Sequence, residues 1–370
     1  MSRQKPELPP CYALVHPGLE EVAGEEIVQD FGGDVKKTGT GFLVFRMPAI
    51  DADLLNLRTT EDVFVLAWGT DELTYRAKDL DSIEHWTARK ADWTKLLQIH
   101  HAVRPKPKGK PSFRLVVQME GKHGYRRLDA RKALARGLAG KIPASWRHVE
   151  ENAAVEIWLT IHGDRAVCGV RLSDRTMRHR TYKNVHVPAS LRPTLAAAMV
   201  RLAELQPGQI VLDPMCGAGT LLAEAALAAR DAGRRQGQRF PLKLIGGDSD
   251  KDAVAAATAN LRPLAEARLN LWDAKKLPLH ERSVDCILCN PPFGKQLGAP
   301  EEIASLYRAA GREWERVLRP GGAAVLLVMD ARAMQEAVRS LGWQQRRRVD
   351  VRILGQRSTI LAYRKRDSHG

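Results

Sequence analysis

The stretch IVLDPMCGAGTLLAEAAL, residues 210–227, constrains the fold of this chain more than any other. A short apolar strand ends at Asp213, a turn containing Gly217 and Gly219 follows, and an Ala/Leu-rich helix begins near Thr220. In a doubly wound α/β sheet, such a first turn binds a nucleotide, because glycines let the backbone approach and the helix N-terminus favours an anionic group. The turn is neither a G-x-x-x-x-G-K-[ST] phosphate loop nor a G-x-G-x-x-G dinucleotide turn.

The C-terminal half alternates regularly between apolar strands and helix-length segments. Continuous apolar runs indicate strands that are buried on both faces, which is typical of a parallel sheet covered by helices. The sequence therefore predicts an α/β, doubly wound, mostly parallel domain. Its expected strand cores are 210–212, 243–246, 284–288, 323–329 and 359–363, and its expected helices are 189–205, 219–233, 250–262, 300–318 and 330–341.

The first 173 residues predict two small α+β modules. The first hundred residues contain a strand from Cys11, a helix ended by Gly32-Gly33, and further elements at 42–47, 50–57, 63–68 and 86–98. The second module contains a strand at 113–118, a basic helix whose expected apolar residues are Leu128, Ala135 and Leu138, and strands at 154–162 and 165–172. The expected boundaries are 1–60 and 61–173 for the two modules, 174–188 for a linker and 189–366 for the α/β domain.

Positive charge is unevenly placed along the chain. With 58 Lys+Arg against 43 Asp+Glu the net charge is +15, and residues 101–180 alone carry +11. A polyanion such as a nucleic acid is therefore the first partner to consider, although a basic surface is also commonly just solvated. The charge is concentrated in a Pro/Lys loop and in the basic helix, with the candidate RNA-binding residues Lys106, Lys108, Lys110, Arg126, Arg127, Arg131 and Lys132, and with Lys295 elsewhere.

The composition also indicates the cellular compartment in which the protein is expected. Five cysteines, mostly within apolar runs, are typical of reduced, buried thiols. No run approaches the ~18 apolar residues of a membrane helix, and the N-terminus lacks the apolar core of a signal peptide. We therefore expect a cytoplasmic protein without a membrane partner, acting as a monomer.

Acidic residues follow two further strands. Asp248, in GGDSD, lies where a carboxylate accepts hydrogen bonds from a ribose diol, and Asp273, in LNLWDAKKLP, lies where one accepts from an adenine amine. Either residue alone is more often a cap or a turn former. Together with Asp213, three carboxylates are expected around one crevice at successive carboxyl strand ends.

The strand expected at 284–288 leads into the sequence VDCILCNPPFGK. Asn290 precedes Pro291 and Pro292, which have no N–H, so the side-chain oxygen and backbone carbonyls remain acceptors that can hold an exocyclic amine. Phe293 offers a ring face for stacking a base. Cys286 and Cys289 form C-x-x-C, but positions i and i+3 of a strand point to opposite faces, so we expect core thiols and no metal site.

DPMCGAGT, GGDSD and NPPFG in this order resemble the Rossmann-like S-adenosylmethionine-dependent methyltransferases that modify exocyclic amines of bases. HVPASLRPTLAAAMVRLAEL is similar to the segment leading into the catalytic domain of the THUMP-containing RNA guanine methyltransferases. YALVHPGLEEVAGEEI resembles the ferredoxin-like domain that precedes THUMP in that family, and residues 61–173 fit THUMP. The resemblance implies methyl transfer to the 2-amino group of a guanosine in transfer RNA, at the sixth nucleotide in the acceptor stem, with contacts to the acceptor stem and 3′ end.

The resemblance also implies roles for individual residues. Asn290, Pro291, Pro292 and Phe293 would hold the target base. The cofactor would be held by a larger set, with Arg192–Thr194 covering it: Arg192, Pro193, Thr194, Asp213, Pro214, Cys216, Gly217, Gly219, Thr220, Asp248, Asp273, Ala274 and Asn290.

Four alternatives remain open at the level of sequence. An NAD-dependent oxidoreductase lacks support because G-x-G-x-x-G is absent, and a non-enzymatic RNA-binding protein would not need the Asp213, Asp248 and Asn290 set. A guanine methyltransferase of large-subunit ribosomal RNA is the nearest rival. Adenine-amine DNA methyltransferases share NPPF but usually lack two preceding RNA-type modules.

Overall fold

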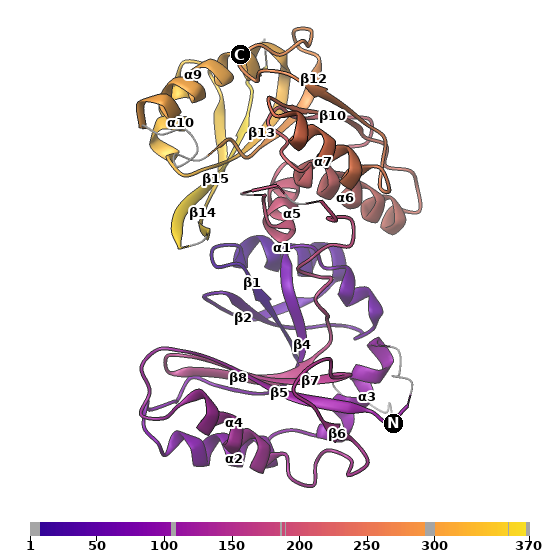
Figure 1. Cartoon of the computed structure of the whole chain (residues 1–370), viewed down its shortest axis with the longest axis vertical. Coiled ribbons are helices and arrows are strands. Elements are labelled where there is room, and N and C mark those ends of the chain that lie inside the picture. The colour runs from indigo at the N-terminus through magenta and orange to yellow at the C-terminus, as the bar shows by residue number, and fades with distance from the viewer. Residues whose placement is uncertain are drawn as a thin grey trace, which may run out of the picture. The chain divides into compact units, whose positions relative to one another are not determined.

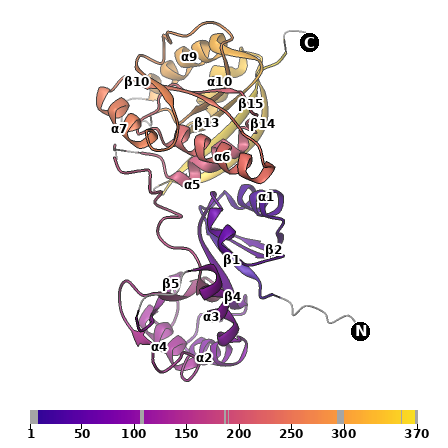
Figure 2. The same ribbon diagram turned by 90° about the vertical axis from the view of Figure 1, so that its right-hand side faces the viewer.

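The computed structural model describes residues 8–104, 109–185, 187–188, 190–292, 300–353 and 355–367. The chain forms two compact units, drawn in Figures 1 and 2. Unit 1 extends to Met177 and unit 2 begins at Arg178, with His16–Ala23 grouped in unit 2. In the part of the chain that the structure describes, no helix is both long and apolar enough to cross a membrane.

Unit 2 contains a seven-stranded sheet in the order β11-β10-β9-β12-β13-β15-β14. The first five strands are parallel, and β15 and β14 are added antiparallel. The strands are β9 (Ile210–Asp213), β10 (Lys243–Asp248), β11 (Ala267–Leu271), β12 (Val284–Cys289), β13 (Leu318–Val328), β14 (Gln344–Ile353) and β15 (Gln356–Arg364). The helices are α5 (Pro193–Leu202), α6 (Thr220–Gln236), α7 (Lys251–Leu261), α9 (Pro300–Val317) and α10 (Ala331–Arg339).

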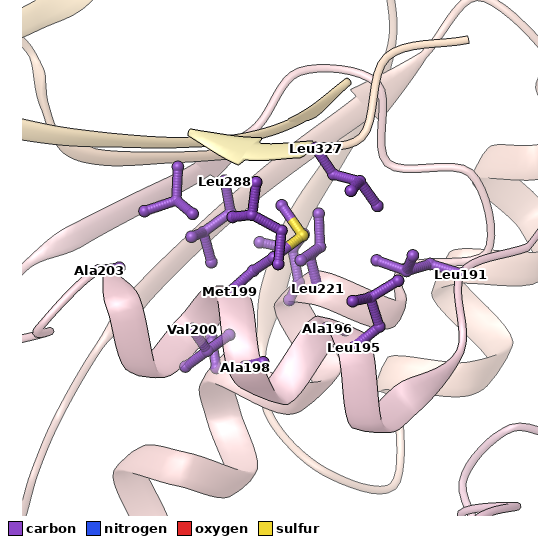
Figure 3. Close-up of a cluster of buried hydrophobic side chains, with 14 of the residues drawn as sticks. Leu191, Leu195, Ala196, Ala198, Met199, Val200, Ala203, Leu221, Leu288 and Leu327 are labelled. Carbon is purple, nitrogen blue, oxygen red and sulfur yellow. The ribbon is translucent and has the colours of Figure 1, made fainter. Parts of the chain in front are cut away.

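Both faces of this sheet are covered by helices. Leu288 and Leu327 pack on one face, against Met199 of α5 and Leu221 of α6 (Figure 3). The intervening strand residues point to the other face, where they pack against α9 and α10 with Trp314 at 0% exposure. The doubly wound α/β prediction is confirmed for the parallel part of the sheet.

The two cysteines of C-x-x-C demonstrate this alternation. Cys286 belongs to the cluster under α5 and α6, whereas Cys289 belongs to the cluster under α9 and α10. Both thiols are free and buried, and burial raises the pKa of Cys286 to about 12. They are core residues on opposite faces, as the strand period predicts.

The last two strands of unit 2 differ from the sequence prediction. The sequence analysis missed β14, QQRRRVDVRI, and did not foresee that β15 is antiparallel. The reason is that β14 is an edge strand whose inward positions Val349 and Val351 are buried while its outward positions are charged. Such a strand lacks the continuous apolar run that marks a central parallel strand.

Unit 1 contains one eight-stranded sheet in the order β2-β3-β1-β4-β8-β7-β5-β6. β5 and β7 are parallel over eight residue pairs, while β1, β3, β4 and β8 pair antiparallel. The elements are β1 (Cys11–Val15), α1 (Glu20–Phe31), β2 (Asp34–Gly39), β3 (Phe42–Arg46), the 3-10 helix η1 (Ala52–Asn56), β4 (Thr60–Thr70), α2 (Asp79–Arg89), α3 (Trp93–Val103), β5 (Ser112–Glu120), α4 (Arg127–Gly137), β6 (Arg147–His148), β7 (Val155–His162) and β8 (Arg165–Arg171).

The two small modules predicted at 1–60 and 61–173 share this sheet. The predicted boundary falls at the start of β4, which pairs with β1 on one side and β8 on the other. An aromatic stack crosses this junction, because Tyr12 of β1 lies 4.4 Å from Phe64 of β4 between ring centroids and Phe64 contacts Trp158 of β7. The helix predicted at 86–98 is in fact two helices, α2 and α3, because Asp92 caps the second one by accepting from Lys95 N–H.

The apolar face predicted for α4 is wrong at two of its three residues, because only Leu138, at the C-cap of the helix, is buried. Leu128 is 55% exposed and Ala135 is also exposed, whereas Ala133 and Leu134 are buried. The buried face packs on α2, where a Cβ on Gly137 would lie 2.6 Å from Glu84 O. This close contact between helices needs small residues. In the sequence, small residues indicate a buried helix face less clearly than the larger Leu128 does.

We expect unit 1 to lose stability in acid through His100. This side chain is 4% exposed, and burial, then the charges of His101 and Arg104, lower its pKa to about 4. The His100 imidazole therefore binds a proton at about pH 6.5 in the unfolded chain but only at about pH 4 in the folded chain. The free energy of unfolding consequently falls as the pH drops from 6.5 to 4, by up to about 3 kcal/mol. Urea unfolding of His100→Leu across this range should show a flatter profile; the same change at exposed His85 should not.

Candidate active site

A cavity of about 650 Å³ opens at the carboxyl ends of β9, β10 and β12. Its size is in the usual range for small-molecule sites. Because the strands are parallel and buried on both faces, their polar residues are confined to these ends. The cavity wall contains Val187, Pro188, Ser190, Leu191, Asp213–Ala218, Thr220, Leu221, Asp248–Asp250, Ala253, Asp273–Lys275, Asn290–Pro292 and Leu306.

The loop between β9 and α6 has the backbone that only glycine adopts readily. Gly217 and Gly219 have φ of +49° and +75°, in the left-handed region. A Cβ on Gly219 would also lie 3.1 Å from the side chains of Ala257 and Leu261 in α7. The glycines therefore serve both the turn and the close approach of α7, and Gly219 itself lies outside the cavity wall.

Trp272 fixes this loop from beneath. Its buried indole N–H donates to Pro214 O at 2.9 Å, and its backbone N–H donates to Asp248 O at 3.0 Å. Gly247 makes room for the ring, since a Cβ there would lie 2.4 Å from it. Cys216 N–H donates to Gly247 O at 2.9 Å, so the β9 loop and the end of β10 are held as one rigid wall.

Two carboxyl groups share the inner end of the cavity. Asp213 is 1% exposed, and burial, with the nearby charge of Asp248, raises its pKa well above the usual value. Asp248 accepts from Gly217 N–H at 2.9 Å and from Asp250 N–H at 3.1 Å, and keeps further acceptor sites on both oxygens. Burial thus favours the neutral form of the Asp213 carboxyl, which a positive group nearby would oppose, whereas the oxygens of Asp248 already accept two backbone hydrogen bonds.

Asp273 lies at the outer rim. Its side chain is 56% exposed, accepts from Lys275 N–H at 2.9 Å and forms an ion pair with Lys275 Nζ at 3.5 Å. The turn-forming interpretation therefore holds, and the residue also lines the cavity next to buried Ala274.

Asn290 presents a buried acceptor without a partner. Its Oδ1 has almost no solvent exposure and accepts no hydrogen bond from the described residues. A buried polar oxygen left unpaired costs about 1–3 kcal/mol, which points to a group that the site is built to receive. Pro291 and Pro292 follow it on the cavity wall and supply no N–H that could satisfy it.

The described residues of the segment 178–191, which precedes α5, are held in place by buried polar groups, and we call them the strap. Val187, Pro188, Ser190 and Leu191 of the strap line the cavity. Asn260 of α7, 0% exposed, accepts from Asn184 N–H and Val185 N–H at 3.1 and 3.0 Å, and donates to Val185 O and Ala218 O at 2.9 and 3.0 Å. One amide thus joins the strap to the glycine loop.

Glu224 of α6 anchors the start of the strap. This fully buried carboxylate accepts from Tyr182 OH at 2.8 Å and from Arg180 Nε at 3.2 Å. Lys183 adds a third tie by donating to Leu191 O, and burial lowers its pKa to about 8. The sequence analysis missed these residues, although Asn260 lies in the stripe Ala253, Ala256, Ala257, Asn260 and Leu261, where a polar residue on a buried helix face signals a partner.

The structure brings most of the predicted site residues together. The lining contains eleven of them: Asp213, Pro214, Cys216, Gly217, Thr220, Asp248, Asp273, Ala274, Asn290, Pro291 and Pro292. Arg192, Pro193 and Thr194 are not in the lining; Pro193 and Thr194 are buried at the start of α5, and Leu191 and Ser190 take the covering position instead. Phe293 and Lys295 lie outside the described residues.

The predicted RNA-binding residues other than Lys295 fall within the range of unit 1. Arg126, Arg127, Lys132 and Lys110 are exposed, and Lys106 and Lys108 lie outside the described residues. Arg131 is instead engaged with Glu150 through two hydrogen bonds, and it lowers the pKa of that carboxyl. Its charge is therefore already compensated.

The described residues contain no group of three or more His, Cys, Asp or Glu side chains that could hold a metal ion. The cavity therefore offers carboxylates, an amide and backbone groups as its polar chemistry.

Residues 180–359 match the family described as RMKL-like, methyltransferase domain. Residues 180–359 of unit 2 form an RMKL-like methyltransferase domain. The match spans the strap, the glycine loop and β12, which are the elements that build the cavity. The fold class predicted from the sequence is confirmed, because the chain is similar over 96% of its length to the crystal structure of TrmN from Thermus thermophilus, with a TM-score of 0.75 and 25% identity over 99% of that chain.

The chain is also similar in sequence to proteins of named activity. The chain is 33% identical over 268 residues to a bovine tRNA (guanine(6)-N(2))-methyltransferase, covering 67% of this chain and 50% of that protein. It is 28% identical over 330 residues to a tRNA (guanine(6)-N2)-methyltransferase of Thermus thermophilus, covering 88% and 91%. The chain thus spans about half the length of the bovine relative and most of the bacterial one, and the resemblance found in the sequence is confirmed.

Asn260→Ala should lower the free energy of unfolding of the methyltransferase domain by at least about 1–3 kcal/mol, since it leaves buried backbone groups unpaired. Asn260→Asp keeps the acceptor for the Asn184 and Val185 N–H groups but cannot donate to Val185 O and Ala218 O. Hydrogen exchange at Asn184 and Val185 should therefore rise strongly in the alanine variant and less in the aspartate variant. Equal, wild-type exchange in both would show that the strap is held without this amide.

Proposed function

We propose that this chain transfers a methyl group from S-adenosylmethionine to the exocyclic 2-amino group of a guanosine in transfer RNA. The observation that carries the proposal is the buried Oδ1 of Asn290 on the wall of the cavity, which accepts no hydrogen bond from any described residue. An acceptor held without a partner beside two prolines suits an exocyclic amine, which has two hydrogens to donate.

The cofactor fits the rest of the cavity. Asp248, at the end of β10, can accept from a ribose diol, and Asp273 with Ala274 lies where an adenine would sit. Asp213 and the glycine loop would face the methionine end, where a positive ammonium would favour the ionised form of the Asp213 carboxyl. When bound, S-adenosylmethionine supplies a methyl group on a sulfonium, already activated for transfer.

Asn290 acts on the nucleophile. The lone pair of the guanine 2-amino group is delocalised into the ring, which makes the amine a poor nucleophile. Asn290 Oδ1 and the Pro291 carbonyl can accept its two hydrogens, which draws the nitrogen toward tetrahedral geometry and directs the lone pair into the cavity. Holding both reactants in this geometry supplies several kcal/mol of the barrier, and the proton leaves after transfer, when the alkylated amine is acidic.

The names of the relatives support the substrate. Both the bovine and the Thermus proteins are named for guanine(6) of transfer RNA, and we assign the same acceptor-stem nucleotide to this chain. The exposed cations of unit 1, on a THUMP-like module, would hold the RNA backbone near the acceptor end, so that distance selects the nucleotide. The buried free thiols suit a reducing compartment such as the cytosol.

Asn290→Ala should lower the single-turnover methylation rate of transfer RNA by about 10²–10³-fold, as loss of one preorganised polar group at a reacting atom does. Cofactor binding and folding should stay near wild type. Asp248→Ala is the comparison variant for cofactor binding, which it should weaken by ~1–3 kcal/mol in calorimetry. Nucleoside mass spectrometry of transfer and ribosomal RNA identifies the product. Unchanged turnover of the Asn290 variant, or methylation found in ribosomal RNA alone, would overturn the assignment.

Arg127→Gln with Lys132→Gln should weaken binding of transfer RNA and reduce the log–log salt slope by roughly 0.7–0.9 for each RNA phosphate that the variant no longer neutralises. Both side chains are exposed on α4. Arg136→Gln is the control on the same helix, because Glu84 already pairs with Arg136. Cofactor affinity should not change in either variant. If the Arg127/Lys132 double variant keeps the wild-type salt slope, RNA does not bind at α4.

A further inference from the structure

Two arginines face each other at the end of the β14–β15 hairpin. Arg352 and Arg357 are direct cross-strand partners, and both are exposed. Like charges directly opposite one another in an antiparallel pair destabilise it. No described carboxylate lies within ion-pair distance of either guanidinium. The hairpin therefore retains an unfavourable pair of charges that an anion would relieve.

The other charges on this face do not neutralise the pair. Asp350 is the nearest acid in the register, opposite Thr359. It accepts from Thr359 Oγ1 at 2.8 Å and pairs with Arg348 at 3.0 Å. The hydrogen bond from Thr359, then the charges of Arg348 and Arg357, lower the pKa of Asp350, so one negative charge acts on both arginines. The outward row keeps two positive charges in excess.

The register places this pair at the same edge of the sheet as Asn290. Cys289 pairs with Leu326 of β13, and Val328 pairs with Thr359 of β15. Arg357 is therefore about three residues, or roughly 10 Å, beyond the level of Asn290 and two strand spacings, again roughly 10 Å, to the side. In Figure 1 the hairpin extends past the end of β13. A nucleic acid whose base enters the cavity would carry its neighbouring phosphates into this range.

We propose that the Arg352–Arg357 pair is an RNA-phosphate clamp that positions the substrate backbone on the methyltransferase domain. This rests on the proposed function, because it takes RNA as the substrate. Guanidinium groups bind phosphate oxygens in a bidentate way, and two of them side by side fit the backbone and not a base edge. Such contacts fix the position of the strand without reading its sequence.

Protection of the sheet edge is the competing explanation. Charged residues on an edge strand prevent pairing with a second sheet, and β14 is an edge strand. This explanation requires charge along the strand but no binding of RNA. It therefore predicts aggregation of neutralised variants with unchanged RNA binding.

The test compares two double variants of the full chain. Arg352→Gln with Arg357→Gln neutralises the pair, and Arg262→Gln with Arg268→Gln removes the same charge from exposed residues of α7's C-terminus and β11, at the opposite side of the sheet. Methylation of a transfer RNA transcript should show KM for RNA raised several-fold in the first variant, with kcat less affected. The salt slope should fall by about 1.5, because two phosphates are no longer neutralised. Calorimetry with the cofactor should match wild type in both.

Two further variants separate charge from structure. Arg352→Lys with Arg357→Lys should recover part of the RNA affinity, because charge remains while the bidentate fork is absent. Arg352→Gln alone should raise the melting temperature without RNA, since it removes one of the two opposed charges. A wild-type KM and salt slope in the Gln double variant, or an equal change in the Arg262/Arg268 control, would overturn the clamp. Failure of wild-type protein to methylate any RNA would instead overturn the proposed function.

Discussion

Burial of the parallel strands on both faces is the constraint on which the methyltransferase domain depends. Because helices cover the two sides of β9, β10, β12 and β13, no polar side chain can be placed along those strands without a buried partner. Polar chemistry is therefore confined to the strand ends. Asp213 and Asp248 end two neighbouring strands and Asn290 follows a third, and the parallel register brings them to one cavity.

The walls of that cavity are held by groups that take no direct part in the proposed chemistry. Trp272 supports the glycine loop from below, and Asn260 ties the same loop to the strap. Both side chains donate hydrogen bonds to buried backbone carbonyls. A buried carbonyl without a hydrogen bond would destabilise the fold, so these two side chains stabilise the loop. Asn290 Oδ1 is the contrasting case, since it is buried and accepts no hydrogen bond from the described residues, which leaves it available to a group bound in the cavity.

Charge in this protein has to be assessed residue by residue. Arg131 is engaged by Glu150 and Arg348 by Asp350, so neither carries a free positive charge despite lying in a basic segment. Arg131 was predicted to bind RNA because it lies in a segment of high net positive charge. The net charge of a segment does not show which residues form ion pairs in the folded chain. Arg352 and Arg357, which no motif singled out, are opposed only because the hairpin register pairs them.

The sequence by itself determined the alternation of strands and helices, the glycine loop and the polar residues after the strands, because strand and helix periods and glycine chemistry are local properties. Only the tertiary structure decided that one sheet runs through both small modules, that Leu191 and not Arg192 faces the cavity, and that α4 buries Ala133 and Leu134 in place of Leu128. These outcomes depend on which surfaces meet, and pairing between segments distant in sequence leaves no local periodicity to detect. The buried amide of Asn260 belongs to the same class, because its four partners come from the strap and the glycine loop, and only folding brings them within hydrogen-bond distance.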